Sequence, residues 1–275
     1  MDRQPLKGVL LAFAAYAAYA FSDASVKLLH GSLDPFAVAF LGAILSLAAI
    51  PFLRAPGDGW RDLVRTVDRR LWLLRAVAAV FGSVGSIMAF TTLPMPEAFA
   101  LIFLLPAYVT LLSVLFLGEA VGWRRWAVVA MGFAGVMIVL RPGFRELNIG
   151  HLGAVFGGLA GAVTIVLMRA LGGREKRISL YGAGVLGPLV VCGAISLPGM
   201  VWPEPWQWLC VAGYGLLLAL ANVLIMLASH HAPASLVAPP QYSQMLWAIL
   251  FGAVLFGDHP DALTFVGAAV IIASG

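Results

Sequence analysis

Long apolar runs separated by short polar segments cover almost the whole 275-residue chain. A helix needs about 20 apolar residues to cross about 30 Å of membrane hydrocarbon, and the chain offers ten stretches near that length. They run approximately over residues 8–29, 35–53, 71–93, 96–117, 124–140, 150–171, 178–197, 205–229, 233–256 and 260–275. Membrane β-strands are instead about ten residues long and alternate in polarity. The pattern therefore predicts an all-α membrane protein with ten transmembrane helices.

The first apolar run also has features of a cleavable signal peptide. Arg3 and Lys7 precede it, and the small residues Ala18 and Ala20 lie where a cleavage site could be. The run nevertheless continues to Leu29, and a similar segment opens the second half of the chain. Both observations favour a retained span.

The composition agrees with a membrane location. Hydrophobic residues make up 61% and charged residues 11%, whereas soluble domains average roughly 45–50% and about 25%. With a cytoplasmic N-terminus, all Lys and Arg residues except Lys27, Arg141 and Arg145 lie at or near cytoplasmic ends of spans. Because Lys and Arg favour that side, the sequence predicts a multi-pass protein of a bacterial inner (plasma) membrane. The same asymmetry explains the net charge of +4 without a nucleic-acid partner.

The chain contains a weak internal repeat. Gly8, Ala12 and Lys27 recur as Gly150, Ala154 and Arg169, and Gly118-Glu119 recurs as Gly257-Asp258. Chance agreement in a composition rich in Gly and Ala is the alternative explanation. Taken as a repeat, the pattern predicts five-span halves at 1–142 and 143–275, the second inverted because five is odd. Inverted halves support alternating access around a midplane site, which favours a carrier over a receptor or an enzyme.

Short motifs in the fourth, fifth, ninth and tenth spans point to a known family. They are Leu104-Leu105-Pro106, Leu117-Gly118-Glu119, Gly132 and Gly135 in the first half, and Ala232-Pro233-Ala234-Ser235-Leu236, Phe256-Gly257-Asp258 and Gly267 in the second. In these features the chain resembles the drug/metabolite transporter superfamily, in particular its EamA-type ten-helix branch, and within it the aromatic amino acid exporters. It departs at Met245, where the second half lacks a counterpart of Pro106 and has Pro239-Pro240 earlier. The resemblance implies export or exchange of small metabolites, amino acids or cationic drugs among them, through a cavity lined by the third, fourth, eighth and ninth spans.

Polar residues inside spans are costly and are therefore candidates for function. The densest group lies in the ninth span, where Gln241, Tyr242, Gln244 and Trp247 follow Pro239-Pro240. Consecutive prolines remove backbone donors, and such breaks are tolerated where a helix lines a cavity. The amides could bind an amino or carboxylate group while the two rings hold an apolar side chain. Ordinary hydrogen bonding between helices, worth about 0.6 kcal/mol on average, is the alternative.

Other spans supply further candidates for substrate binding. Phe99 and Phe103 share one helical face, although a Phe stripe packed against lipid or a neighbouring helix fits equally. Ser86 and Phe90 form a similar face in the third span, and Asn222 is a strong polar residue in the middle of the eighth.

The remaining ionisable residues argue against other classes of function. Asp23 and Lys27 are one helical turn apart and can pair, and Glu97 lies at a span end where water makes charge inexpensive. His230 and His231 lack companions at metal-ligand spacing, and no phosphate-binding loop or hydrolase motif occurs. The sequence thus indicates no metal, no cofactor and no enzyme. The scarcity of cations at membrane depth favours a neutral or zwitterionic small-molecule substrate over a phosphate, and a passive channel is the alternative to a carrier.

Overall fold

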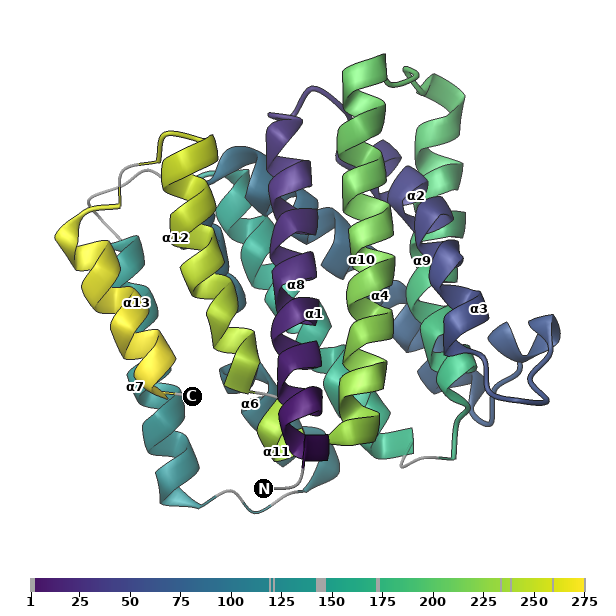
Figure 1. Cartoon of the computed structure of the whole chain (residues 1–275), viewed down its shortest axis with the longest axis horizontal. Coiled ribbons are helices and arrows are strands. Elements are labelled where there is room, and N and C mark those ends of the chain that lie inside the picture. The colour runs from purple at the N-terminus through teal and green to yellow at the C-terminus, as the bar shows by residue number, and fades with distance from the viewer. Residues whose placement is uncertain are drawn as a thin grey trace.

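The computed structural model describes residues 3–118, 120, 122–141, 147–171, 174–232, 234–237, 239–258 and 260–274. Every regular element in this part of the chain is a helix, and most of the helices stand side by side along one direction (Figure 1). The first half contains α1 (Arg3–Leu28), α2 (Pro35–Ser46), the 3-10 turn η1 (Leu47–Ala49), α3 (Ile50–Leu53), η2 (Trp60–Leu63), α4 (Arg69–Thr92), α5 (Met95–Ile102), α6 (Leu105–Leu117) and α7 (Trp123–Leu140). The second half contains α8 (Ile149–Leu171), α9 (Arg177–Ser196), η3 (Leu197–Gly199), α10 (Pro205–His231), α11 (Ala234–Val237), η4 (Pro239–Tyr242), α12 (Ser243–Leu255) and α13 (Ala262–Ser274).

These helices correspond to the ten predicted spans. Seven segments of the described chain are long and apolar enough to cross a membrane, and two shorter apolar helices are Trp126–Leu140 and Ala262–Ser274. The tenth segment is the broken stretch formed by α11, η4 and α12. The prediction of an all-α membrane protein with ten spans is confirmed.

Local sequence determines where several helices begin and end. The Asp34 carboxylate accepts a hydrogen bond of 3.0 Å from the third residue after it, and Pro35 is the first residue of α2. Before α4, the Asp68 carboxylate accepts bonds of 2.9 and 3.2 Å from the backbone amides of Arg70 and Leu71. Both aspartates satisfy amide groups that a helix start leaves unpaired. Gly118 follows α6 with φ of +65°, a left-handed conformation that glycine adopts without strain.

The fourth and ninth spans are both interrupted. α5 ends at Ile102 and α6 begins at Leu105, with Pro106 in its first turn. Proline lacks the amide hydrogen that would continue the helix from residue 102. The predicted fourth span is therefore present as the apolar segment Met95–Leu117, with an interruption between α5 and α6. In the ninth span, Pro239-Pro240 begins the 3-10 turn between α11 and α12, which confirms the predicted break.

The contacts between helices repeat from one half to the other. α1 packs along α10, and α8 packs in the same way along α4; α2 contacts α10 as α9 contacts α4. α7 and α13, the last helix of each half, pack against each other at one edge of the bundle (Figure 1). Exchanging the halves maps each pair onto another, as two inverted repeats require. The boundary predicted between residues 142 and 143 lies outside the described residues and stays a prediction.

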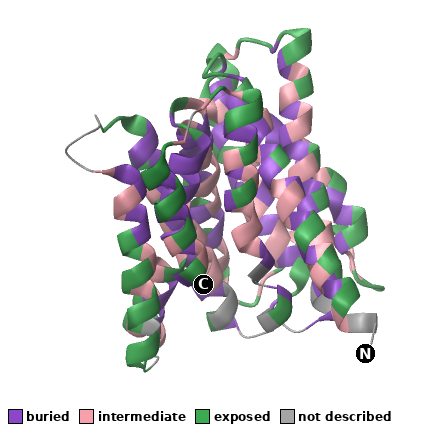
Figure 2. Ribbon diagram, turned by 60° about the vertical axis from the view of Figure 1, so that its left-hand side comes forward, coloured by how far each residue is buried: buried purple, intermediate pink, exposed green. Residues whose placement is uncertain are grey.

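The outward faces of the bundle are strongly apolar. Large side chains such as Phe13, Phe81 and Phe156 expose 46%, 58% and 52% of their surface. Figure 2 shows exposed positions along outward helix faces and buried positions between the helices. A water-soluble protein rarely exposes so large an apolar surface, whereas contact with lipid chains suits these side chains.

One loop between α3 and α4 is held to the second half by ion pairs. The Lys176 ammonium donates to Asp58 and to Asp62 at 2.9 Å each. Hydrogen bonds from the Gly59 amide and from Lys176 lower the pKa of Asp62 below its ordinary value. A lowered carboxyl pKa contributes stability above the ordinary pKa of about 3.9, and this contribution disappears as the pH falls through the lowered value.

We therefore expect acidification below about pH 4 to release this loop. Hydrogen exchange followed by mass spectrometry should show faster exchange over residues 55–66 at low pH, and a Lys176→Gln variant should show it already at pH 7. Lys7→Gln, which removes an exposed lysine elsewhere, is the control. Unchanged protection in Lys176→Gln at neutral pH would contradict this role of the ion pairs.

Candidate functional site

Four aromatic side chains predicted from the sequence form a continuous row. The ring centroids of Phe90 and Phe99 are 5.0 Å apart, those of Phe99 and Phe103 6.2 Å, and those of Phe103 and Tyr242 5.8 Å. The last two rings are nearly parallel, with an interplanar angle of 22°. This aromatic row, defined as Phe90, Phe99, Phe103 and Tyr242, connects α4, the break in the fourth span and the break in the ninth.

The breaks explain how the row forms. Phe103 follows the last residue of α5, and Tyr242 is the last residue of η4, so the two rings that stack are carried by the two interrupted spans. Phe90 and Phe99 are 2% exposed, whereas Tyr242 is half-buried. The row is thus packed at one end and partly accessible at the other.

The other ninth-span candidates lie on the same segment of the chain as Tyr242. The Trp247 ring is 5.9 Å from Phe21 of α1 and 5.5 Å from Phe251, measured between centroids. Gln241 and Gln244 are half-buried on the same segment. This segment therefore combines partly accessible amides with aromatic rings.

Two further candidates lie elsewhere. Ser86 on α4 faces α8, where its hydroxyl is 3.2 Å from the position that a Cβ on Gly157 would occupy. Asn222 donates to the Leu218 carbonyl at 2.8 Å and lines a separate cavity near the ends of α3 and α10. The structure does not bring Asn222 together with the aromatic row.

That separate cavity has a volume of about 370 Å³. Its wall contains Leu53, Arg75, Arg177, Leu180, Tyr181, Asn222, Ile225 and Met226. We name this part of the bundle, where α9 begins and α10 ends, the Arg75 end. Arg75 is 7% exposed, and Tyr181 is fixed by donating its hydroxyl to the Ser46 carbonyl at 2.8 Å.

The opposite end of the bundle, which we name the Lys27 end, is tied by a second set of charged groups. The Lys27 ammonium donates to the Leu93 carbonyl at 2.7 Å and lies 3.4 Å from the Asp258 carboxylate. Asp258 also accepts a bond of 3.1 Å from the Met95 amide. These contacts join α1, the start of α5 and the end of the ninth span. The predicted pairing of Lys27 with Asp23 is wrong, because Asp258 from the other half is the partner in the folded chain.

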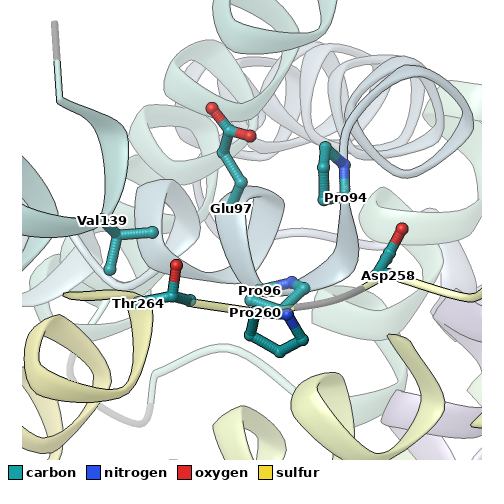
Figure 3. A pocket seen from close by; sticks show the side chains of 7 residues that line it. All are labelled: Pro94, Pro96, Glu97, Val139, Asp258, Pro260 and Thr264. Atoms are coloured by element: carbon teal, nitrogen blue, oxygen red, sulfur yellow. The ribbon is translucent and has the colours of Figure 1, made fainter. Parts of the chain in front are cut away.

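A small cavity of about 140 Å³ lies beside this ion pair. Figure 3 shows its walls, where Glu97 and Asp258 lie near Pro94, Pro96 and Pro260. It is too small for an organic solute. A second cavity at this end, of about 290 Å³, is lined by Lys27, His30, Thr91, Thr92, Leu93, Pro94, Phe256 and Asp258.

Glu97 at this end is buried, contrary to the prediction from the sequence. It is 4% exposed, and its carboxylate lies 3.1 Å from His151 Nε2 on α8. His151 Nδ1 in turn lies close to Asn148, which orients the ring. The sequence placed Glu97 in contact with water because it lies near a span end; in the structure, α8 covers it.

Sequence reasoning missed Arg75 although a signal was present. Arg75 lies inside the predicted span 71–93, and an ionisable residue at membrane depth is a candidate for function by default. Its position near the start of that span also fits the pattern of cytoplasmic positive charges, and this hid the signal. Lys27, Arg75 and Glu97 together show that the interior holds more charge than the sequence predicted. Among the described residues, no group of three or more His, Cys, Asp or Glu is arranged to hold a metal ion.

The chain has two inverted halves of five spans each, and the fourth span of each half is interrupted. This is the architecture of a multi-pass membrane transporter. The chain belongs to the EamA-like transporter family, whose profile matches residues 6–141 and again residues 148–274. Each half thus carries one copy of the family unit, and the protein is a small-molecule transporter rather than an enzyme.

Several characterised proteins are similar over most of the chain. A riboflavin transporter of Vibrio cholerae serotype O1 is 29% identical over 281 residues, covering 100% of this chain and 93% of the relative. An S-adenosylmethionine uptake transporter of Rickettsia felis is 26% identical over 262 residues, covering 91% and 85%. A riboflavin transporter of Rhizobium johnstonii is 30% identical over 231 residues, covering 83% and 75%. One solved crystal structure superposes with a TM-score of 0.67 at 18% identity, covering 97% of this chain and 94% of its own, and supports the fold.

Proposed function

We propose that this transporter is a secondary carrier of small organic solutes that contain a flat ring, aromatic amino acids among them. It works by alternating access in a bacterial inner membrane, with the N-terminus and the Arg75 end on the cytoplasmic side. The observation that carries the proposal is the aromatic row, which connects the interrupted fourth and ninth transmembrane segments. Within it, the Phe103 ring stacks on the Tyr242 ring.

The chemistry of the row supports a ring-containing solute. Stacked aromatic pairs contribute about 0.5–1.5 kcal/mol beyond the burial of their surface, and a ring on the solute can take the place of one partner. Riboflavin and S-adenosylmethionine, for which the relatives are named, both contain a fused heteroaromatic ring. S-adenosylmethionine also carries an amino acid head group, which the half-buried amides of Gln241 and Gln244 suit.

Broken helices at the site support alternating access. Each break frees backbone groups at membrane depth, and such segments persist where they line a cavity between moving repeats. Ion pairs between the halves tie both ends of the bundle, Lys27 with Asp258 at one end and Lys176 with Asp58 and Asp62 at the other, so a change of access at either end has to break such pairs.

The direct test is transport by the purified protein in liposomes. Labelled tryptophan, phenylalanine, riboflavin and S-adenosylmethionine are offered separately, with and without the same unlabelled compound inside. A carrier should show saturable uptake that internal substrate accelerates. Uptake that rises linearly with concentration and ignores internal substrate would instead indicate a channel.

Substitutions at Tyr242 and at its ninth-span neighbours Gln244 and Trp247 should weaken transport without unfolding the protein. We expect Tyr242→Ala and Trp247→Ala to raise KM about threefold to tenfold, since each removes stacking worth about 0.5–1.5 kcal/mol, and Gln244→Ala to lower transport by removing a polar contact. Tyr242→Phe should retain most activity because the ring remains. Phe156→Ala is the matched control, since Phe156 is 52% exposed on an outward face. Normal kinetics in Tyr242→Ala and Trp247→Ala, with size-exclusion profiles like the wild type, would exclude this site.

A further inference from the structure

The buried guanidinium of Arg75 lacks the partners that such a group requires. Arg75 is 7% exposed, and its Nε and Nη1 atoms are buried with no hydrogen-bond partner among the described residues. Native proteins pair nearly all buried polar atoms, and burying a charge without a partner costs several kcal/mol. An acceptor from outside the chain would remove this cost.

The surroundings of Arg75 favour an anion as that acceptor. The cavity wall contains a second cation, Arg177, and none of its lining residues within the described chain is acidic. Arg177 and Leu180 belong to the first turn of α9, a 20-residue helix whose N-cap residue Lys176 provides no side-chain cap. The start of a helix presents unpaired amides and a partial positive charge, both of which attract anions.

The geometry leaves room for a ligand. The cavity holds about 370 Å³, and the Arg75 Nη2 atom lies against α9, 3.4 Å from the position that a Cβ on Gly184 would occupy. Arginine presents a planar fork that matches carboxylate and phosphate in two parallel hydrogen bonds. Because Arg75 lines the cavity, a ligand held there lies within reach of this fork.

We propose that this cavity is an oxyanion site in which Arg75, assisted by Arg177 and the start of α9, binds a carboxylate or phosphate group. The assignment of that group to the transported solute rests on the proposed function. The solute then presents its acidic group at the Arg75 end, and its ring reaches the aromatic row when the halves rearrange. This replaces the sequence-based expectation that the interior disfavours anions.

Binding to the purified protein in detergent tests the site without requiring transport. Benzoate and its neutral counterpart benzamide are compared by thermal shift and by equilibrium dialysis of the labelled compounds. The wild type should prefer benzoate by about tenfold to a hundredfold, the range expected for hydrogen bonds to a charged group, and inorganic phosphate should compete while chloride at equal ionic strength should not. Equal binding of benzoate and benzamide by the wild type would overturn the site.

Variants then locate the binding group. Arg75→Gln should abolish the preference for benzoate, and Arg75→Lys should retain a part of it because the charge remains but the fork is lost. Arg70→Gln, which changes an exposed arginine of the same helix, should bind like the wild type. If Arg75→Gln does not fold, phosphate competition in the wild type and benzoate binding by Arg75→Lys still test the role of Arg75. An undiminished preference in Arg75→Lys or Arg75→Gln would refute the role of Arg75.

Lipid headgroups are a second source of phosphate for this site. Reconstitution into phosphatidylcholine with or without phosphatidylglycerol should leave the benzoate preference unchanged. Loss of the preference with phosphatidylglycerol would assign the site to lipid and overturn the solute assignment.

Transport measurements separate the oxyanion site from the proposed function. Benzoate binding by a protein that transports none of the ring compounds would keep the oxyanion site and refute the proposed function. The ratio of the transport rates of tryptophan and tryptophanamide is a further test. If this ratio is the same in the wild type and in Arg75→Gln, the assignment of the oxyanion to the transported solute is refuted, and the oxyanion site itself remains.

Discussion

An Asp258→Asn variant is expected to open the Lys27 end of the bundle. The substitution keeps an acceptor for the Met95 amide but removes the negative charge 3.4 Å from Lys27. Lys27 is buried, and among the described residues its ammonium also donates to the Leu93 carbonyl and lies 5.0 Å from the centre of the Phe256 ring. Removing one partner of a buried ion pair costs about 3–5 kcal/mol because the other charge is left behind. An arrangement that exposes Lys27 to water avoids this cost.

Accessibility labelling measures the opening. A Thr91→Cys reporter lines the same cavity as Lys27 and Asp258, and Cys192 and Cys210 are replaced by alanine. We expect Asp258→Asn to raise the rate of reaction with a membrane-impermeant maleimide at least about tenfold, from the energy above. Asp261→Asn is the matched control, because its ion pair with Arg141 is more exposed and exposed pairs contribute about 0–1 kcal/mol.

A double variant separates charge from shape. Lys27→Gln with Asp258→Asn leaves no orphan charge, so labelling should return toward the wild-type rate. A double variant as reactive as Asp258→Asn alone would show that the ion pair is not what closes this end.

A Gly85→Ala variant is expected to lose stability because two helix backbones meet at this glycine. A Cβ on Gly85 would lie 2.5 Å from the Gly153 carbonyl oxygen, and a Cβ on Gly153 would lie 2.6 Å from the Gly85 carbonyl oxygen. Both obstacles are backbone atoms of α4 and α8, which cannot turn away as a side chain can. Small residues permit such close approach in membranes, and overpacking costs about 1–3 kcal/mol.

Thermal unfolding of the purified protein checks this expectation. Gly82→Ala, one turn earlier on the same helix, is the matched control, since its Cβ would meet Ala160 at an ordinary 3.7 Å. We expect Gly85→Ala to unfold several degrees lower, as about 1–3 kcal/mol implies for a chain of this size, and Gly82→Ala to unfold like the wild type. Equal melting temperatures for the two variants would mean that α4 and α8 can separate without cost.

The internal repeat in the sequence has a partial counterpart in the packing of the helices. The match of Gly8 with Gly150 has a structural counterpart: Gly8 lies against the end of α10 near Ala232, and Gly150 lies against the end of α4 near Thr92. The repeat also matches Arg169 to Lys27 and Glu119 to Asp258, but the side chains of Arg169 and Glu119 lie outside the described residues.

The candidate site was predictable in its parts and less so in its assembly. Proline at positions 239 and 240 predicted the ninth-span break that carries Tyr242, because proline lacks an amide hydrogen wherever it occurs. The partner of Tyr242 could not be inferred in the same way, since Phe103 reaches it only through the break in the fourth span. Asn222 had the same polarity signal as Gln241 but lines the cavity at the Arg75 end, away from the ninth-span segment, because that signal does not say which face of a helix meets which neighbour.

By itself the sequence determined the number of spans, their inverted halves and the family, because the length of apolar runs and short motifs are properties of neighbouring residues. The tertiary structure alone decided that Lys27 pairs with Asp258, that Glu97 meets His151, and that Arg75 is buried beside a cavity. Each of these depends on the packing of helices from opposite halves, and the energy of a charge is set by the groups that packing brings within a few ångströms of it.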